Sequence, residues 1–346
     1  MRGWTDLAGE AQAALNTHFW DGEARLYRVC LPPRLVRPED PFHYWWQAHA
    51  LDTLVDAYVR EGDGAHLTRA AELVEGVRRG NHGSLHNDYY DDMLWMALAL
   101  LRLHRATSDP RFLDDSLSLW EDIRGGWNGH EGGGVAWRKT QLDYKNTPAN
   151  APAVILGARL YEQTGEKEHL DFALEVLHWL QAHLIDPATG EVWDGVGREE
   201  PGRIDRDWAF TYNEGTVIGA GVAVWRATGD GAALDLARRT AVAAMKRYGP
   251  VLLAEGEGDG GLFKGILVRY LGLLAREDAG SVAELEAFLS ENAAVAARHL
   301  SPAYHLNGPN WTAEPTLPLD LSAALSGVML LESAAAVERA ASRVRA

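Results

Sequence analysis

Apolar residues recur along most of this chain with the spacing of amphipathic helices, and no convincing two-residue alternation indicates strands. We predict twelve helices, which form six consecutive pairs. They cover about residues 4–19, 44–60, 65–79, 88–106, 110–124, 148–164, 167–184, 213–228, 231–248, 261–276, 281–299 and 319–340. The pattern predicts an all-α protein.

The connections between these helices are of two kinds. Short polar turns containing Gly, Asp or Pro follow the second, fourth, sixth and eighth helices, at 61–64, 107–110, 164–166 and 228–230. The other connections are mostly longer and carry aromatic and polar residues, at 42–47, 86–92, 137–150, 207–214, 259–264 and 310–312. If helices alternate between an inner and an outer ring, the aromatic connections all lie on one rim.

This asymmetry predicts an (α/α)6 barrel of six helical hairpins, with a central depression surrounded by helix N-termini. An open solenoid of helix pairs is the alternative. The spacing between successive short turns grows from about 46 to about 64 residues, whereas solenoid repeats keep their period better. We therefore favour the closed barrel. No linker or shift in composition separates a second domain, so a single barrel domain over residues 1–346 is expected.

Composition narrows the class of protein. Of 346 residues, 47% are hydrophobic and 24% are charged, which is typical of a globular protein with a large core. The net charge of −16 argues against nucleic acid or an anionic membrane surface as a partner. Thirteen Trp residues suit sugar rings, although Trp is also ordinary core material. Cys30 is the single cysteine, which excludes an intramolecular disulfide and a thiolate metal cluster.

The N-terminal residues lack an apolar stretch of signal-peptide length, and no segment approaches about 18 uninterrupted apolar residues. We therefore expect a cytoplasmic protein, although a chain from which an export signal had been removed would look the same. Nothing in the sequence indicates a protein partner.

Two adjacent carboxylates, Asp91 and Asp92, fall in the first turn of a helix that is otherwise apolar all round. Asp88 is the expected N-cap of this helix. Acidic residues favour helix N-termini on any helix, by about 0.3–1 kcal/mol each. An entirely apolar helix is buried, however, so its first turn faces core or cavity. Together with the neighbouring aromatic rings, the pair suggests acid, base or nucleophile chemistry on a ring-shaped substrate.

The spacing of this pair leaves the mechanism open. Neighbouring side chains on a helix diverge by about 100°, so two carboxyl groups could lie at the separation of about 5–5.5 Å found in retaining glycosidases. They could also splay to the wider separation of inverting enzymes. Adjacency favours retention without proving it.

Other polar and aromatic residues on the predicted rim are candidates for binding a sugar. Each has a simpler alternative: the asparagines could cap a helix, at least one Trp of the pair 45–46 could belong to the core, and Glu214 could be an ordinary first-turn acid. The acidic residues at 255, 257 and 259 lack the spacing of a calcium loop and are interpreted as a solvated loop. The candidates are Trp45, Trp46, Gln47, Asn87, Tyr90, Trp137, Asn146, Asn150, Trp208, Tyr212, Asn213 and Glu214.

Motifs of several other enzyme classes are missing from the sequence. There is no His-Glu-x-x-His metal motif, no Gly-x-Ser-x-Gly elbow and no phosphate-binding Gly-Lys-Ser/Thr loop. We expect neither a metal nor a cofactor.

Three segments resemble glycoside hydrolase family 76, the endo-acting α-1,6-mannanases. They are Tyr89-Tyr90-Asp91-Asp92-Met93-Leu94-Trp95, Lys145-Asn146-Thr147 with Asn150-Ala151-Pro152, and Thr211-Tyr212-Asn213-Glu214-Gly215. The resemblance covers roughly residues 42–230. It implies an (α/α)6 barrel, retaining hydrolysis of α-1,6-mannosidic bonds, and roles for Asp91 as nucleophile and Asp92 as acid/base. Many family members are secreted, so the absence of an export signal in this chain favours oligosaccharides over polymeric mannan.

Two alternatives remain at this point. A sugar epimerase or unsaturated-uronide hydrolase on the same barrel would depend more on His or on a single acid. A non-catalytic carbohydrate-binding protein would keep the cleft without turnover.

Overall fold

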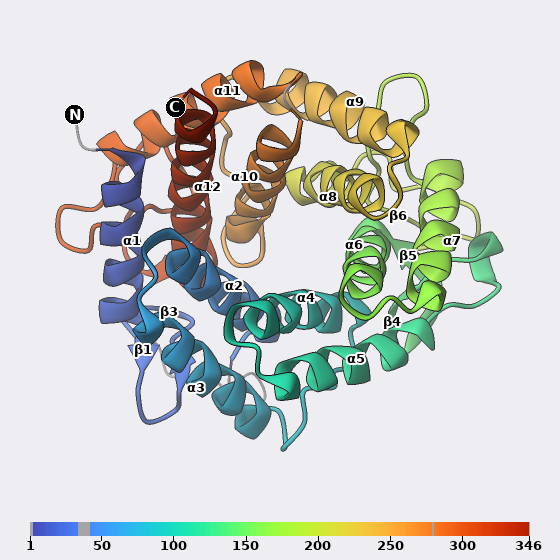
Figure 1. The fold of residues 1–346 in the computed structure, drawn as a ribbon, viewed down its shortest axis with the longest axis horizontal. Coiled ribbons are helices and arrows are strands. Elements are labelled where there is room, and N and C mark those ends of the chain that lie inside the picture. Colours follow the sequence, from blue (N-terminus) through green and yellow to red (C-terminus); the bar gives the residue numbers. More distant parts are fainter. Residues whose placement is uncertain (1–2, 34–41, 279, 346) are drawn as a thin grey trace. The chain divides into compact units, whose positions relative to one another are not determined.

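Helices dominate the computed structural model, which describes residues 3–33, 42–278 and 280–345. Within these ranges there are twelve α-helices (Figure 1). The chain forms two compact units. Unit 1 comprises Met1–Leu85, Arg102–Asp109 and Tyr248–Ala346, and unit 2 comprises His86–Leu101 and Pro110–Arg247. The prediction of one domain over the whole chain stays a prediction.

Unit 1 contains six complete helices, and α12 packs against α10, α1 and α2 within it. Most of its buried side chains are apolar, and α12 is buried along most of its length. Within α12, Leu321–Ser342 is long and apolar enough to cross a membrane, but 83% of its most apolar window is buried, as in a core helix. The helices are α1 (Trp4–Phe19), α2 (Tyr44–Glu61), α3 (Gly64–Gly80), α10 (Gly260–Glu277), α11 (Val282–Arg298) and α12 (Leu321–Arg345).

Unit 2 is centred on α6, which packs against α7 and α8 (Figure 1). It also contains the first part of α4 (Tyr90–Thr107), and α9 belongs to it except for its last residue. Buried side chains cover nearly the whole of α6 and α8, as expected for helices in the interior of the unit. The other helices are α5 (Pro110–Arg124), α6 (Thr147–Thr164), α7 (Lys167–His183), α8 (Thr211–Thr228) and α9 (Gly231–Tyr248).

The tight turns occur where the sequence predicts them. Gly62, Gly165 and Gly229 follow α2, α6 and α8 with φ between 75° and 77°, and each N–H returns to a carbonyl of the last turn. Glycine adopts this left-handed conformation without the steric cost of a Cβ. The helix boundaries agree with the prediction to within about two residues, except that α12 continues to Arg345 where the sequence predicts an end near residue 340. Pro148 lies in the first turn of α6 as expected.

The structure also contains short strands, which the sequence pattern did not predict. In unit 2, β4 (Ala136–Arg138), β5 (Gln141–Asn146) and β6 (Gly195–Val196) form an antiparallel sheet with Ala136 opposite Lys145 and Asn146 opposite Gly195. In unit 1, β1 (Trp20–Asp21) pairs with β2 (Leu26–Tyr27), and β3 (Cys30–Leu31) pairs with β7 (Leu319–Asp320). Most of these strands are too short to show an alternating pattern.

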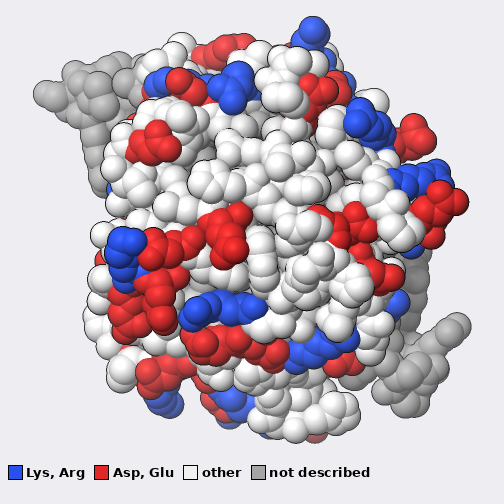
Figure 2. All heavy atoms as spheres, turned by 90° about the vertical axis from the view of Figure 1, so that its right-hand side faces the viewer, with Lys and Arg blue, Asp and Glu red and all other residues white. Residues whose placement is uncertain are grey.

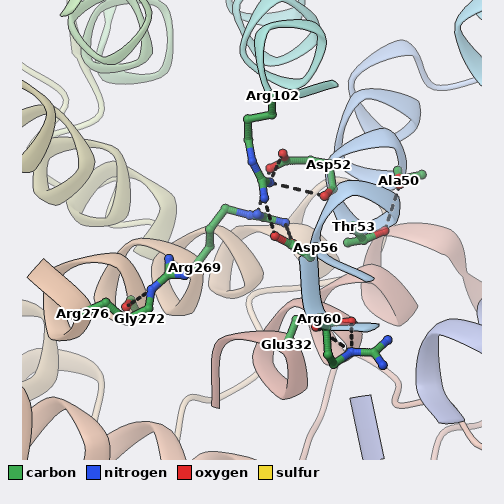
Figure 3. A network of polar contacts seen from close by, with 10 residues as sticks. All are labelled: Ala50, Asp52, Thr53, Asp56, Arg60, Arg102, Arg269, Gly272, Arg276 and Glu332. Atoms are coloured by element: carbon green, nitrogen blue, oxygen red, sulfur yellow. Dashed lines mark hydrogen bonds and ion pairs between the residues drawn. The ribbon is translucent and has the colours of Figure 1, made fainter. Parts of the chain in front are cut away.

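Unit 1 also contains a network of charged side chains between helices (Figure 3). Asp52 and Asp56 of α2 each pair with both Arg102 of α4 and Arg269 of α10; the Arg269 nitrogens lie 2.9 and 2.8 Å from the carboxylates. In a separate pair, Arg60 Nε lies 3.0 Å from Glu332 of α12. These contacts join α2, α4, α10 and α12 within the unit.

Acidic side chains exceed basic ones in the sequence, 49 to 33. On the face drawn in Figure 2, the described basic side chains lie singly or beside acidic ones among uncharged residues.

Candidate functional site

The loop before α4 is organised by Asn87. Its side-chain oxygen accepts the N–H of Tyr89 at 3.0 Å, and its amide nitrogen donates to Asp92 Oδ2 at 3.1 Å. The first contact is a local turn of the kind that Asn favours. Helix α4 begins at Tyr90, because Tyr89 pairs with Arg138 in a β-bridge. The prediction of Asp88 as the N-cap is therefore wrong, since the helix begins one residue later than that cap requires.

Asp91 and Asp92 lie in the first turn of α4, as predicted, and both are half-buried. The two oxygens of Asp91 accept different donors. Oδ1 accepts the backbone N–H of Asp92 at 3.0 Å, and Oδ2 accepts the indole N–H of Trp137 at 3.1 Å. Asp91 thus has an N–H donor on each carboxylate oxygen, at the N-terminal end of α4. The Asp91 side chain is thereby fixed in orientation.

Trp137 reaches Asp91 from β4. The edge of its ring system packs against two tyrosines, with ring centroids 5.2 Å from Tyr89 and 5.8 Å from Tyr144. The guanidinium of Arg138 lies 4.7 Å from the centroid of the same indole. These contacts hold the indole in place, so the hydrogen bond to Asp91 comes from a rigid donor.

The buried carboxylate of Asp194 accepts hydrogen bonds from several polar side chains, including Tyr144. Its Oδ1 accepts Tyr212 Oη and Asn213 Nδ2, both at 3.1 Å, and its Oδ2 accepts Tyr144 Oη at 3.0 Å and Arg198 at 2.7 Å. Burial raises the pKa of Tyr212 well above its ordinary value, and the charges of Asp194 and Asp91 add to this effect. Tyr212 therefore remains a neutral hydroxyl whose environment includes the charge of Asp91.

Arg198 connects this buried group to an exposed aromatic residue. Its guanidinium lies 4.3 Å from the ring centroid of Tyr144 and 3.9 Å from that of Trp208, and it pairs with Asp205 at 2.8 Å. Trp208 is 46% exposed and also contacts Phe210. An exposed indole held by a cation on one face is suited to contact a ligand.

Two predicted sugar-binding asparagines are engaged in holding the fold. Asn146 is the N-cap of α6 and accepts the N–H of Ala149 at 3.2 Å. Asn150 is fully buried, and it bonds both backbone groups of Val135 and the carbonyl of Asn146. Lys145 donates to the carbonyl of Gly134 at 2.8 Å, and burial lowers its pKa to about 8. Sugar contact by either asparagine stays a prediction, whereas their observed hydrogen bonds tie the 132–135 segment to α6.

Three other predicted residues lie in unit 2. Glu214 is buried in the first turn of α8, Asn213 is buried beside Asp194, and Tyr90 is buried with its ring against Gly126. A Cβ at Gly126 would lie 2.8 Å from the Tyr90 ring, so this close packing requires glycine.

The remaining predicted residues, Trp45, Trp46 and Gln47, lie in unit 1 at the start of α2. Both indoles donate to the same oxygen of Asp259, at 3.0 and 2.9 Å. Gln47 is fully buried and bonds both backbone groups of Tyr27. Asp259 is exposed, which agrees with the interpretation of the 255–259 segment as a solvated loop, and its carboxylate is also the acceptor for this pair of Trp residues.

One group of potential metal ligands is present among the described residues, Glu166, Glu168 and His169, whose ligand atoms lie within 4.8 Å of one another. The two glutamates are exposed, and His169 accepts the indole N–H of Trp120 at 2.9 Å. These contacts are typical of the exposed first turn of a helix, here α7, that packs against a Trp side chain.

The sequence reading did not identify Tyr144, Asp194 or Arg198. Asp194 and Arg198 belong to a segment without helical periodicity, and Asp194 is 48 residues from Asn146 in the chain. Pairing of β5 with β6 brings them together. A pattern confined to neighbouring residues contains no signal for such a contact.

Known proteins are similar to this chain over most of its length. The sequence profile of glycosyl hydrolase family 76 matches residues 4–343. A mannan endo-1,6-alpha-mannosidase of Candida glabrata is 25% identical over 307 residues, which are 79% of this chain and 67% of that protein. The GH76A α-1,6-mannanase of Salegentibacter sp. HEL1_6 is 38% identical, with a TM-score of 0.91 over 96% of this chain and 99% of that chain.

An inactive variant of the same mannanase, with alanine in place of two consecutive aspartates, was solved in complex with α-1,6-mannotetrose. It is 37% identical to this chain, with a TM-score of 0.92 over 97% of this chain and 100% of that chain. Structures of this family are (α/α)6 barrels, and this likeness confirms the predicted fold class. Because the family profile spans nearly the whole sequence, this chain belongs to glycosyl hydrolase family 76 and is a glycoside hydrolase.

Proposed function

We propose that this enzyme hydrolyses α-1,6-mannosidic bonds in mannan or its oligosaccharides with retention of anomeric configuration. The Candida glabrata and Salegentibacter relatives bear the names of α-1,6-mannan-cleaving enzymes, which supports the linkage and the sugar. The proposed site comprises the first turn of α4, the hairpin of β4 and β5 that carries Trp137, and the residues that bond Asp194.

In the first step, an oxygen of the Asp91 carboxylate attacks the anomeric carbon of the mannosyl unit. Asp92, as the carboxylic acid, gives its proton to the glycosidic oxygen, which takes the electron pair of the breaking C–O bond and leaves as an alcohol. A mannosyl ester of Asp91 forms, and Asp92 is left as a carboxylate.

In the second step, Asp92 removes a proton from water while the water oxygen attacks the same anomeric carbon. The ester bond to Asp91 breaks, and its electron pair returns to the carboxylate. The two displacements each invert the anomeric carbon, so the product retains the configuration of the substrate, and both aspartates recover their starting protonation states.

The resemblance to family 76 gives Asp91 the role of nucleophile and Asp92 that of acid/base, and the contacts of the two aspartates hold both side chains at the start of α4. Asp91 accepts N–H donors on both oxygens, from Trp137 and from the Asp92 backbone. The Asp92 side chain accepts a neutral amide donor from Asn87. The observation that carries the proposal is the pair of consecutive aspartates in the first turn of α4, and alanine replaces two consecutive aspartates in the inactive Salegentibacter mannanase.

Hydrolysis of α-1,6-mannotetraose followed by proton NMR tests the proposed reaction. We expect the α-anomer of the new reducing end to accumulate first, with the β-anomer rising later at the rate of mutarotation. Initial appearance of the β-anomer would contradict retention and require a water between the two carboxylates. A mannotetraose that remains intact would contradict the proposed substrate.

A further inference from the structure

Asp122 of α5 lies outside the proposed site. It bonds two side chains that belong to the segments beside the catalytic aspartates. Its Oδ2 lies 2.7 Å from His86 Nδ1 and 2.8 Å from Lys139 Nζ. On the other side of the imidazole, Ser118 Oγ lies 3.1 Å from His86 Nε2, so α5 holds the ring at both nitrogens.

Each of these partners lies next to a residue that donates to a catalytic aspartate. His86 directly precedes Asn87, whose amide donates to Asp92. Lys139 follows two residues after Trp137, whose indole donates to Asp91. One carboxylate oxygen therefore connects the segment that carries the Asp92 donor with the segment that carries the Asp91 donor.

The same two segments are also joined to each other. The backbone N–H of Lys139 donates to the carbonyl of Asp88 at 2.8 Å, and Tyr89 and Arg138 form an isolated antiparallel bridge. Both segments are thus paired at one edge and anchored to α5 through Asp122.

We propose that Asp122 is a positioning residue, which sets the places of Asn87 and Trp137 and through them the orientation of the two catalytic carboxylates. The proposal rests on the proposed roles of Asp91 and Asp92. Asp122 itself does not touch the reacting atoms.

A purely stabilising role for Asp122 would have a different signature. The side chains of Asp122, Lys139 and His86 are 23%, 33% and 41% exposed. Ion pairs of such partly solvated groups typically contribute about 0–1 kcal/mol to stability. Displacement of a catalytic group by about 1 Å, in contrast, can reduce the rate about 100-fold. A positioning role therefore predicts a large change in kcat with a small change in Tm.

The test compares Asp122→Asn with Asp122→Glu and with a matched control, Asp114→Asn, at an exposed position of the same helix. With α-1,6-mannotetraose as substrate, we expect Asp122→Asn to lower kcat about tenfold to 100-fold, with KM within about twofold of the wild type. We expect Asp122→Glu, which keeps the charge, to recover much of the rate, and Asp114→Asn to match the wild type.

A readout independent of turnover is the NMR signal of the Trp137 indole N–H, assigned by its loss in Trp137→Phe. Asp122→Asn should shift this signal, because the hydrogen bond to Asp91 changes, and Asp114→Asn should leave it in place. An unshifted signal in Asp122→Asn overturns the proposal, as does a wild-type kcat or a loss of kcat that only follows the loss of folded protein. If the wild type leaves mannotetraose intact, the proposed substrate fails, and the indole signal alone decides the role of Asp122.

Discussion

Replacement of either Asp91 or Asp92 by asparagine is expected to lower kcat on α-1,6-mannotetraose by about 10³-fold or more, because each carboxylate performs a step that an amide cannot perform. An amide at position 91 could not form the mannosyl ester, and an amide at position 92 could neither donate nor remove the proton. The amide keeps the size of the side chain, so the helix start should remain intact. Steady-state kinetics and far-UV circular dichroism on the same preparations measure both quantities.

The chain offers a matched control for this experiment. Asp114 and Asp115 are also consecutive aspartates, but they lie inside α5 rather than at a helix start, and Asp114 is exposed. We expect Asp114→Asn to retain wild-type kcat. Activity within about tenfold of the wild type in both Asp91→Asn and Asp92→Asn would be inconsistent with the two-carboxylate mechanism.

The largest expected effect on stability comes from the charged network of unit 1 (Figure 3). Arg269→Met keeps most of the side-chain volume but removes a cation that lies 2.9 Å from Asp52 and 2.8 Å from Asp56. Of the two arginines that pair with both carboxylates, only Arg102 would then be left. Removal of one partner from a buried ion pair typically costs about 3–5 kcal/mol, because a charge is left uncompensated. Since these side chains are 14–18% exposed, we expect about 3 kcal/mol.

Urea unfolding followed by circular dichroism measures this loss. The matched control is Arg238→Met, which removes an arginine from a pair with Asp235 whose side chains are 40% and 57% exposed. A surface pair of this kind contributes little, so the control should unfold within about 0.5 kcal/mol of the wild type. If both changes lowered the free energy of unfolding equally, the Asp52–Asp56–Arg102–Arg269 network would contribute no more to stability than a surface ion pair.

Much of the helical architecture is readable in the sequence because its determinants are local. The apolar spacing of the helices, the C-terminal glycines at 62, 165 and 229, and Pro148 at the start of α6 each act within a few residues. The aspartate pair is also a local signal, since two carboxylates precede an entirely apolar helix. These features predicted the helices, the tight turns and the position of Asp91 and Asp92.

The surroundings of that pair depend on contacts between distant segments. Trp137 reaches Asp91 from the three-residue strand β4, which is too short for an alternating pattern. Pairing of β5 with β6 brings Asp194 to Tyr144, and Asp194 also accepts Tyr212 and Asn213 of α8. Composition does not distinguish an amide that binds ligand from one that satisfies a buried backbone, as Asn150 shows. Both uses require a polar side chain near a helix start.

The most direct measurement of the central claim is the identification of the residue that becomes mannosylated. An α-mannoside with a good leaving group needs little proton donation, so Asp92→Asn should form the ester but hydrolyse it slowly. Rapid quenching and peptide mass spectrometry should then find one mannosyl unit on Asp91. A mannosyl unit on another residue, or an Asp92→Asn enzyme that turns over with no covalent adduct, would contradict the role of Asp91 as nucleophile.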